Sequence, residues 1–537
     1  MSDVVPHELK KHDIKVSTVV FMIFCLCAAG AYGIEEMIPV AGPGLTIVML
    51  IVLPFVWSTP LGLVAAELGS SRPQEGGYYK WVQEACGEFW GFQAGWWRTI
   101  SIYIDNTLYV ILAGGYMATA LGLGALPEFF IKAGIIAIFT YINIRGIRDV
   151  GIISTILSVL VIAAFGLVAI VGFANWHFNP MIPFIPEGQT LLQSIGYGIA
   201  IGLWMYSGYE SMSTVAGEVK NPQVIPKATL ITVPLIMAVY ILPTIGGLGS
   251  IGQWESWATD GGISFSDVPT TFLGPAFGLI FVAVSVLAQC SIYNTYIASG
   301  SRGFFTLAGD NLAPPILVKV DAKHGVPYVA VLSVAITNLI LCNFAFTVIV
   351  VVDVFMLMSA YVLIFISAMI LRKKIPDSER PFKIPGGDVF MYIMCIIPIL
   401  IAFVSYFING TDYFIGGMIG ILSGPILYVF WKRRYGGLAK NDPIKYPINP
   451  KTRLAVGDMK KIAMIFCGIG LMGVIGSIFL PWYEGAGGND YYLETYGIEN
   501  MLDLMVAWIK YVAYGAIALS IVLGIYAVKV EPKKITG

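Results

Sequence analysis

The sequence carries little charge for its length. Of 537 residues, 12% are charged and 57% are hydrophobic, whereas a soluble globular domain has about 25% charged residues. The mean hydropathy is +0.78. Such a composition cannot cover a water-facing surface, so it excludes a soluble enzyme and a nucleic-acid-binding protein. It predicts an integral membrane protein whose surroundings are the lipid bilayer.

Histidine and paired cysteine are scarce as well. All four His residues lie outside the long apolar runs, and the seven Cys residues are scattered without a CxxC spacing. This pattern argues against a metal site, a haem and a disulfide framework. No Lys follows a Gly, so the Gly-Lys of a phosphate-binding loop is missing and an ATP-driven pump is disfavoured. We therefore expect no cofactor, no metal and no enzymatic activity.

Apolar runs long enough to cross about 30 Å of hydrocarbon occur along most of the chain. The predicted spans are residues 17–41, 45–69, 89–118, 126–143, 150–173, 190–217, 227–250, 271–300, 326–348, 350–371, 389–408, 412–431, 459–481 and 504–527. An even number of spans, about fourteen, places both termini on one side of the membrane.

The basic residues indicate which side that is. All Lys and Arg residues except Arg98, Lys132 and Lys510 fall in the tails or in the loops on the side of the termini. By the positive-inside rule, both termini are cytoplasmic. We expect a multi-pass protein of the cell (plasma) membrane.

The first and sixth spans share a motif. Residues 31–42 read AYGIEEMIPVAG and residues 206–217 read YSGYESMSTVAG, with six identities at an offset of 175. Because the sixth span comes five places after the first, an odd offset, the copies cross the membrane with opposite polarity. This is the inverted repeat of many secondary transporters.

Both copies place helix-weakening residues and an acid in mid-span. Gly30 and Gly33 weaken the first helix, and Ser207 and Gly208 weaken the sixth. Unwound backbone at this depth is tolerated only where protein or a water-filled cavity satisfies it, so two facing breaks predict a central polar site. Free N–H groups at a half-helix end suit a carboxylate, and free carbonyls suit an ammonium. We expect a small-molecule substrate with an amine, a carboxylate or both.

Four stretches carry a family resemblance in combination. They are WSTPLGLVAAELGSSRPQEGGYYKWVQEACGEFWGFQAGWW (57–97), GYESMSTVAGEVKNPQVIPKA (208–228), GSRGFFTLAGDNLAPPILVKVDAKHGVP (300–327) and RPFKIPGG (380–387). Over roughly residues 15–435 the chain resembles the amino acid/polyamine/organocation (APC) permeases. The strings GIEEM and WWRTISIYIDNTLY are most similar to polyamine-uptake permeases, while others are also similar to glutamate/GABA antiporters.

The resemblance implies an all-α fold with alternating access and a substrate between the broken helices 1 and 6. We expect a five-plus-five inverted-repeat transporter core. The domains are a cytoplasmic tail (1–16), the first repeat with helices 1–5 (17–173), the second repeat with helices 6–10 (190–371), helices 11–12 (389–431), a basic cytoplasmic linker (432–458), extra helices 13–14 (459–527) and a cytoplasmic tail (528–537). The extra helices exceed the usual twelve and have no assigned role.

Acids at helix depth are costly and are therefore functional candidates. Glu35 and Glu36 lie in the first break, where they repel a substrate carboxylate and attract an additional amine. The alternative is that one of them bonds backbone amides and the other is protonated, which leaves zwitterions open. Arg98 and Asp105 lie two turns apart on one helical face and predict an ion pair or a network, either structural or functional.

Three further ionisable residues have a simpler interpretation. Glu67 lies near the cytoplasmic end of its span and is expected to snorkel to the interface. Asp353 and Lys510 lie near extracellular ends and are interpreted as solvated interface residues.

The resemblance also implies roles for Trp204 and Glu210. Arginine/agmatine antiporters of the family place a Trp six residues before a Glu, and LWMYSGYE repeats that spacing. Trp204 is then an aromatic platform or gate, and Glu210 is the proton-linked acid. Cation–π contact with an ammonium is the physical reason for the Trp. The candidate substrate-binding residues are Gly30, Tyr32, Gly33, Glu35, Glu36, Asp105, Trp204, Tyr206, Ser207 and Gly208.

Protons are preferred to sodium as the coupling ion. The eighth span offers Gln289, Ser291, Asn294 and Thr295 as sodium ligands, but Ser and Thr on buried helices usually bond their own backbone. The sequence thus predicts a proton-coupled secondary active transporter for amino acids or related amines, leaning to cationic amines and polyamines. The alternative is an exchanger of neutral or acidic amino acids (glutamate/GABA-like), with a cation channel or a transport-like sensor behind it. No oligomeric state is predicted.

Overall fold

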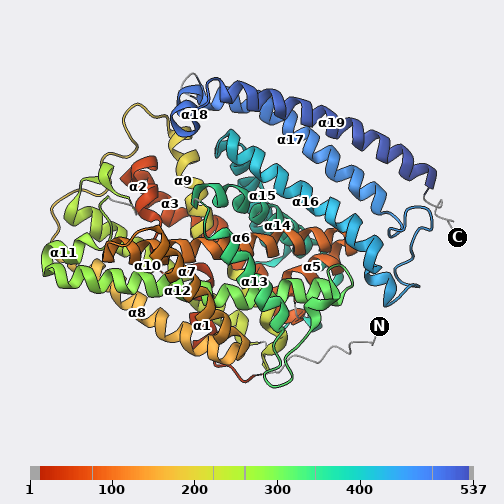
Figure 1. Ribbon diagram of the computed structural model, residues 1–537, viewed down its shortest axis with the longest axis horizontal. Coiled ribbons are helices and arrows are strands. Elements are labelled where there is room, and N and C mark those ends of the chain that lie inside the picture. The colour runs from red at the N-terminus through yellow and green to blue at the C-terminus, as the bar shows by residue number, and fades with distance from the viewer. Residues whose placement is uncertain are drawn as a thin grey trace.

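The computed structural model describes residues 12–28, 30–74, 76–221, 223–258, 262–344, 346–485 and 488–530. In these residues the regular structure is helical, with three isolated β-bridges (Figure 1). The all-α prediction is confirmed.

The described residues up to Ile251 form ten α-helices in sequence. They are α1 (Val16–Cys27), α2 (Ile34–Ala41), α3 (Pro43–Leu53), α4 (Thr59–Ser71), α5 (Gly77–Cys86), α6 (Glu88–Leu121), α7 (Ala125–Ile144), α8 (Ile147–Ala174), α9 (Leu191–Met205) and α10 (Val224–Ile251). A π-helical turn, η1 (Pro54–Ser58), joins α3 to α4, and a 3₁₀ segment, η2 (Tyr209–Glu218), follows α9.

The second half continues in the same way. Its helices are α11 (Asp267–Leu273), α12 (Pro275–Gly309), α13 (Tyr328–Leu341), α14 (Phe346–Lys374), α15 (Gly387–Ile408), α16 (Thr411–Tyr435), α17 (Asp458–Glu484), α18 (Gly488–Tyr496) and α19 (Met501–Val530).

Ten helical segments of the described chain are long and apolar enough to cross a membrane, and two shorter apolar helices, α1 and α13, accompany them. They begin near Pro43, Ala125, Ser154, Val224, Pro275, Asp353, Gly387, Thr411, Asp458 and Met501. The protein is therefore a multi-pass membrane protein. The count of fourteen spans and the inverted repeat stay predictions.

The two predicted helix breaks are confirmed. The first span divides into α1, which ends at Cys27, and α2, which begins at Ile34. Gly30 and Gly33 between them have φ values of 116° and 96°, which a residue with a Cβ rarely adopts. The sixth span leaves the α conformation after Met205 and continues as η2.

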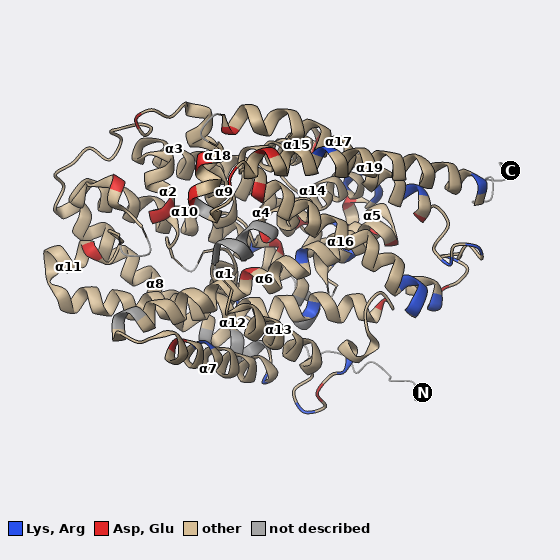
Figure 2. Ribbon diagram, turned by 45° about the horizontal axis from the view of Figure 1, so that its top comes forward, with Lys and Arg blue, Asp and Glu red and all other residues tan. Residues whose placement is uncertain are grey.

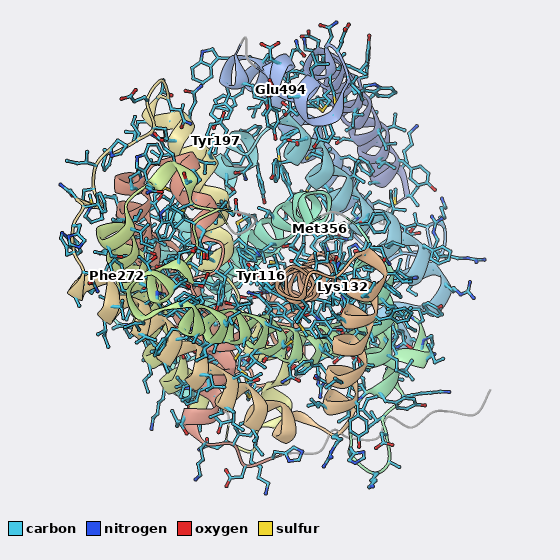
Figure 3. All side chains as sticks on the ribbon, turned by 60° about the vertical axis from the view of Figure 1, so that its left-hand side comes forward. Tyr116, Lys132, Tyr197, Phe272, Met356 and Glu494 are labelled. Carbon is cyan, nitrogen blue, oxygen red and sulfur yellow. The ribbon has the colours of Figure 1, made fainter. Side chains whose placement is uncertain are left out.

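Helix α6 forms the centre of the packing. It contacts α5, α7, α12, α13, α14 and α16, and Figure 1 shows it running through the middle of the bundle. Side chains fill the space between the helices (Figure 3), where Met356 of α14 lies in the interior and Glu494 of α18 lies at the outer edge. Because α6 carries Arg98 and Asp105, both residues lie in the centre of the helix bundle, where they are buried.

The last two long helices form a separate layer. Figure 1 shows α17 and α19 side by side along one flank of the molecule. A Cβ at Gly473 of α17 would lie 2.7 Å from the Cβ of Ala513 of α19, so a small residue permits the close approach. Figure 2 shows Lys and Arg concentrated at the end of the molecule where α16 and α19 end.

Candidate substrate and coupling site

The break in the first span is stabilised by its own acid. Glu35 lies in the first turn of α2 and is 2% exposed. Its Oε2 accepts a hydrogen bond from the backbone N–H of Gly33 at 3.0 Å. A carboxylate at a helix N-terminus is favoured by the dipole and by the unpaired N–H groups. The alternative in which one of the two glutamates bonds backbone amides therefore holds for Glu35, while Glu36 is half-buried beside it.

The break in the sixth span touches the first. A Cβ at Gly208, whose φ is 107°, would lie 2.3 Å from the carbonyl oxygen of Leu26. The N–H of Gly208 donates to the hydroxyl of Tyr361 at 2.9 Å. The hydroxyl of Ser207 accepts from the indole N–H of Trp57 at 3.1 Å. The two breaks thus lie face to face, as predicted, and neighbouring helices satisfy part of the freed backbone.

A buried ion pair joins the sixth span to α6. The Nε of Arg98 lies 2.6 Å from Oε1 of Glu210, and their side chains are 1% and 0% exposed. Arg98 also donates to the hydroxyls of Ser101 at 3.2 Å and Ser211 at 2.9 Å. Its guanidinium lies over the rings of Tyr296 and Tyr361, at 5.9 and 5.8 Å from their centroids.

The prediction of a pair between Arg98 and Asp105 is wrong. Seven residues along a helix correspond to about 10.5 Å of rise, so the two side chains share a face without meeting. Arg98 reaches Glu210 instead, 112 residues away in sequence. The network interpretation stands, but its ionic centre is the Arg98–Glu210 pair.

Asp105 accepts a hydrogen bond from Trp204, the residue that the sequence predicts to be an aromatic platform or gate. The indole N–H of Trp204 donates to Oδ1 of Asp105 at 3.1 Å, and the hydroxyl of Tyr109 donates to Oδ2 at 3.3 Å. The rings of Tyr109 and Trp204 are stacked, with centroids 6.2 Å apart and planes at 15°. The far edge of Trp204 lies 3.4 Å from the position of a Cβ on Gly33. Trp204 therefore bridges the first break and the carboxylate of Asp105.

The predicted substrate-binding residues Tyr32 and Tyr206 lie in two different surroundings. The ring of Tyr32 packs edge-on against Phe165 at 4.9 Å, close to Gly30, so it lies on the wall of the first break. The hydroxyl of Tyr206 donates to the carbonyl of Leu50 at 2.8 Å. Tyr206 is fully buried in this contact and anchors the sixth span to α3 rather than facing the acids.

The interface interpretations of Glu67 and Asp353 are wrong. Glu67 is 3% exposed and accepts two hydrogen bonds from Nη1 of Arg372, at 2.8 and 2.6 Å. Asp353 is 1% exposed. It lies inside because α14 begins at Phe346, two turns before it. The apolar sequence around residue 349 contains no polar marker for that boundary.

Hydroxyls at the predicted sodium position bond one another. Thr295 donates to the carbonyl of Ser291 at 3.0 Å, as expected for a buried helix. The thiol of Cys25 lies 2.7 Å from the hydroxyl of Ser291, and Ser154 lies 2.8 Å from Thr295. This neutral cluster connects α1, α8 and α12. In the described residues, no group of three His, Cys, Asp or Glu side chains is placed to hold a metal ion.

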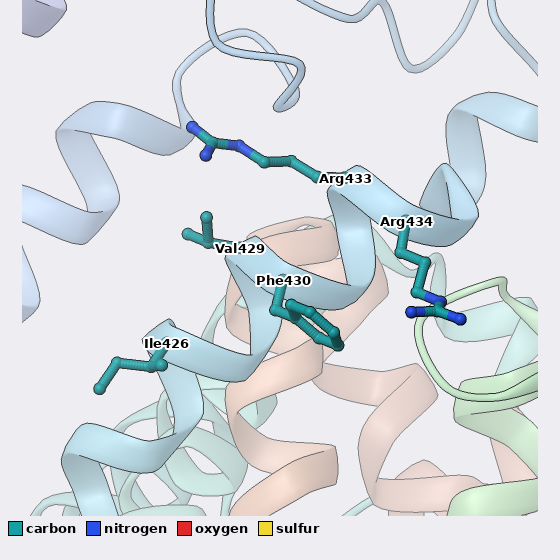
Figure 4. A pocket seen from close by; sticks show the side chains of 5 residues that line it. All are labelled: Ile426, Val429, Phe430, Arg433 and Arg434. Atoms are coloured by element: carbon teal, nitrogen blue, oxygen red, sulfur yellow. The ribbon is translucent and has the colours of Figure 1, made fainter.

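A shallow hollow lies on the outer surface of α16 (Figure 4). It is lined by Ile426, Val429, Phe430, Arg433 and Arg434. Arg433 donates to the carbonyl of Thr452 at 3.1 Å. With two arginines and no acid in its lining, the hollow does not suit a cationic substrate.

The family model for amino acid permeases matches residues 14–429. The chain belongs to this family. This confirms the prediction of a permease rather than an enzyme. The match ends before α17, so the layer formed by α17 and α19 lies outside it.

Individual relatives agree with the family. The chain is 32% identical to the polyamine transporter RMV1 of Arabidopsis thaliana, over 75% of this chain and 82% of that protein. It is 29% identical to the polyamine transporter PUT1 of Oryza sativa subsp. japonica, over 81% of each. It is 26% identical to the serine/threonine exchanger SteT of Bacillus subtilis (strain 168), over 70% of this chain and 86% of that protein.

A solved structure has the same fold. The crystal structure of MhsT in complex with L-phenylalanine superposes with a TM-score of 0.55 at 14% identity, covering 76% of this chain and 99% of that one. At this identity the likeness establishes the fold of the permease and leaves its substrate to the residues of the site.

Proposed function

We propose that this permease is a secondary active transporter of cationic amines, with polyamines as its preferred substrates. The substrate is held between the facing breaks of the first and sixth spans. The observation that carries the proposal is the charge of the site: Glu35, Asp105 and Glu210 are buried around the breaks with one guanidinium, Arg98, among them. The polyamine transporters among the relatives support the same substrate class.

An amine fits this site better than an anionic amino acid. A buried carboxylate without a counter-ion is costly, and a substrate ammonium supplies the missing positive charge. The aromatic face of Trp204, fixed by Asp105, adds cation–π attraction. A neutral amino acid exchanger is the second candidate. It is supported by relatives such as the serine/threonine exchanger SteT.

We assign the coupling proton to Glu210. Only one of its oxygens is bonded: Oε1 accepts from Arg98 and from the hydroxyl of Ser211, while Oε2 has no hydrogen-bond partner among the described residues. A proton on Oε2 would weaken the ion pair and loosen η2 from α6. Proton binding would in this way be linked to movement of the broken helix, as alternating access requires.

The arrangement in the membrane belongs to the same proposal. The breaks in the first span and in the sixth, five places later, support a five-plus-five inverted repeat, with helices 13–14 added beyond it. The concentration of Lys and Arg at the end of the molecule where α16 and α19 end supports a cytoplasmic location for that end and for the termini (Figure 2).

The proposal is tested by uptake of labelled putrescine into proteoliposomes that contain the purified protein, with and without an inward proton gradient. Arginine, glutamate, 4-aminobutyrate and alanine serve as competitors. We expect gradient-stimulated putrescine uptake that arginine inhibits and glutamate does not. Uptake of alanine or glutamate without any response to amines would contradict the proposed substrate class.

A further inference from the structure

A second acid lies beside Asp105, on a different helix. Asp353 of α14 is 1% exposed and Asp105 of α6 is 3% exposed. Helices α6 and α14 pack against each other, which brings the two carboxyl groups into one buried region. Three residues further along α14, on the same face, Met356 lies in the packed interior (Figure 3). Asp353 therefore faces the protein and not the lipid.

Neither acid has a counter-ion of its own. The one guanidinium nearby, Arg98, forms its ion pair with Glu210. Among the described residues, Asp105 and Asp353 form no ion pair, and Oδ1 of Asp353 has no hydrogen-bond partner. Three buried carboxyl groups share one guanidinium, so Asp105 and Asp353 have no cationic partner of their own. Buried charges are normally paired, so the site lacks cationic charge that a ligand can supply.

Aromatic rings surround the acids. Tyr109 is stacked on Trp204, and the ring of Tyr296 lies 5.8 Å from that of Tyr109. Acids combined with the faces of Tyr and Trp form the environment that recognises an ammonium group. A metal ion is a poorer match, because no third His, Cys, Asp or Glu side chain among the described residues joins the two acids to complete a metal site.

Trp204 also gives the direction in which a substrate extends. One edge of its indole lies beside Gly33, whose N–H is bonded by Glu35, and its N–H is bonded to Asp105. A flexible chain of methylene groups can lie along this ring, with one charged end at the first break and the other near Asp105. An amine with a single charge fills only the first of these positions.

We propose that Asp105 and Asp353 form a second ammonium subsite, which makes this permease selective for diamines and longer polyamines over monoamines. The inference rests on the proposed function and deepens it. One ammonium of the substrate lies at the break beside Glu35, and the other lies between Asp105 and Asp353. Tyr109, Trp204 and Tyr296 exclude water from the second position.

The wild-type protein provides the first test. Competition against labelled putrescine is measured on the purified full chain with two ligands of equal carbon number, 1,4-diaminobutane and 1-aminobutane. We expect the diamine to bind at least tenfold more tightly, because it alone completes the charge of the subsite. Equal affinities would overturn the subsite and leave amine transport intact. Binding of labelled alanine by a protein that does not bind labelled putrescine would overturn the subsite and the proposed function together.

Variants locate the effect. Asp353→Asn is expected to lower the affinity for 1,4-diaminobutane at least tenfold while the affinity for 1-aminobutane changes less than twofold. Asp353→Glu, which restores the charge, is expected to recover diamine selectivity. Glu494→Gln, a change on the exposed helix α18 (Figure 3), serves as the matched control and is expected to leave both affinities unchanged.

Two results from the variants would overturn the subsite. Equal loss of diamine and monoamine binding in Asp353→Asn would show that Asp353 only supports the fold. Unchanged diamine selectivity, accompanied by loss of the response to a proton gradient, would show that the acid pair holds a proton and not a substrate ammonium.

Discussion

Two buried arginine–glutamate pairs differ in how completely the carboxylate is bonded. Glu67 accepts two hydrogen bonds from Arg372, at 2.8 and 2.6 Å, and a third from the backbone N–H of Ile384 at 2.8 Å. Both of its oxygens are occupied. Glu210 uses only Oε1 for Arg98, and its Oε2 has no partner among the described residues.

This difference indicates that the Glu67–Arg372 pair stabilises the fold, whereas the Glu210–Arg98 pair can take part in transport. Glu67 already has a guanidinium as its counter-ion and three hydrogen bonds, so it fastens α4 to the end of α14 and to the loop that follows it. A carboxylate with a free oxygen can take up a proton or a new cation. The surroundings agree, because Glu210 lies next to the helix break at Gly208 and Glu67 lies in an unbroken helix.

Removing the fully bonded carboxylate should have the largest effect on stability. In Glu67→Ala, Arg372 stays buried without its main partner. Breaking a buried pair in this way costs about 3–5 kcal/mol. We expect a markedly lower melting temperature and a low yield of monodisperse protein in detergent.

The control for this variant is a solvent-exposed pair. Glu84, whose side chain is 39% exposed, pairs with Arg72 at 3.1 Å, and exposed pairs contribute about 0–1 kcal/mol. Glu84→Ala should therefore melt close to the wild type. A wild-type melting temperature for Glu67→Ala would remove the distinction between the two buried pairs.

Neutralising the partly bonded carboxylate should change transport more than folding. In Glu210→Gln, the side-chain carbonyl still accepts from Arg98, while the group no longer binds and releases a proton. We expect proton-driven putrescine uptake to fall at least tenfold, as for loss of an interaction worth about 1.4 kcal/mol or more. Exchange of putrescine across the membrane without a gradient should persist.

The response to pH decides whether Glu210 is the coupling residue. Uptake is measured between pH 5 and pH 8 in wild type and in Glu210→Gln, with Glu84→Gln as the control. A variant whose uptake still follows the external pH as the wild type does would assign the coupling proton to another acid.

The two pairs also show what the sequence could and could not predict. Runs of apolar residues predict the helices, because each helix must present a hydrophobic surface to lipid. Gly30, Gly33 and Gly208 predict the breaks, because their positive φ values are a local property of the backbone. The role of Trp204 as an aromatic platform or gate is implied by the family resemblance and stays a prediction, whereas its position beside Gly33 comes from the structure.

The partners of the buried charges could not be predicted, because they depend on how distant helices pack. Arg98 is 112 residues from Glu210, and Arg372 is 305 residues from Glu67. Sequence spacing favours Asp105 as the partner of Arg98, and only the packing of α6 against the sixth span shows otherwise. Asp353 was assigned to the interface because no polar residue marks the start of α14.

Removing the indole N–H of Trp204 should have an intermediate effect on putrescine uptake. Trp204→Phe keeps a ring that stacks on Tyr109 and removes the N–H that holds Asp105 at 3.1 Å. Loss of a hydrogen bond worth about 1 kcal/mol corresponds to about fivefold, so we expect the half-saturating concentration of putrescine to rise by about that factor.

Trp96 offers the matched control for this change. Its indole N–H donates to the hydroxyl of Ser423 at 2.8 Å, away from the breaks. Trp96→Phe therefore removes a similar hydrogen bond without touching Asp105. Equal effects of the two variants on uptake would show that Trp204 acts through packing alone.

The smallest effect on stability is expected at Asp377, an exposed residue near the Glu67–Arg372 pair. Asp377 is exposed and contacts Arg380 at 2.9 Å and Lys383 at 2.7 Å. Arg380 lies in turn 3.8 Å from Glu67. The hydrogen bond and charge of Lys383 hold the pKa of Asp377 below its usual range, so the folded state favours the ionised form. The stabilisation is therefore present above the unfolded pKa, about 3.9, and is lost as the pH falls through the lower folded value.

Asp377→Asn should accordingly melt slightly below wild type at pH 7, by far less than Glu67→Ala, because solvent screens an exposed pair. The difference should shrink as the pH falls below about 4, where wild-type Asp377 also loses its charge. Melting temperatures of both proteins across this range measure it. A difference in melting temperature that stays constant with pH would mean that Asp377 acts through its hydrogen-bond geometry. A decrease as large as that of Glu67→Ala would mean that Asp377 stabilises the fold as strongly as the buried Glu67–Arg372 pair does.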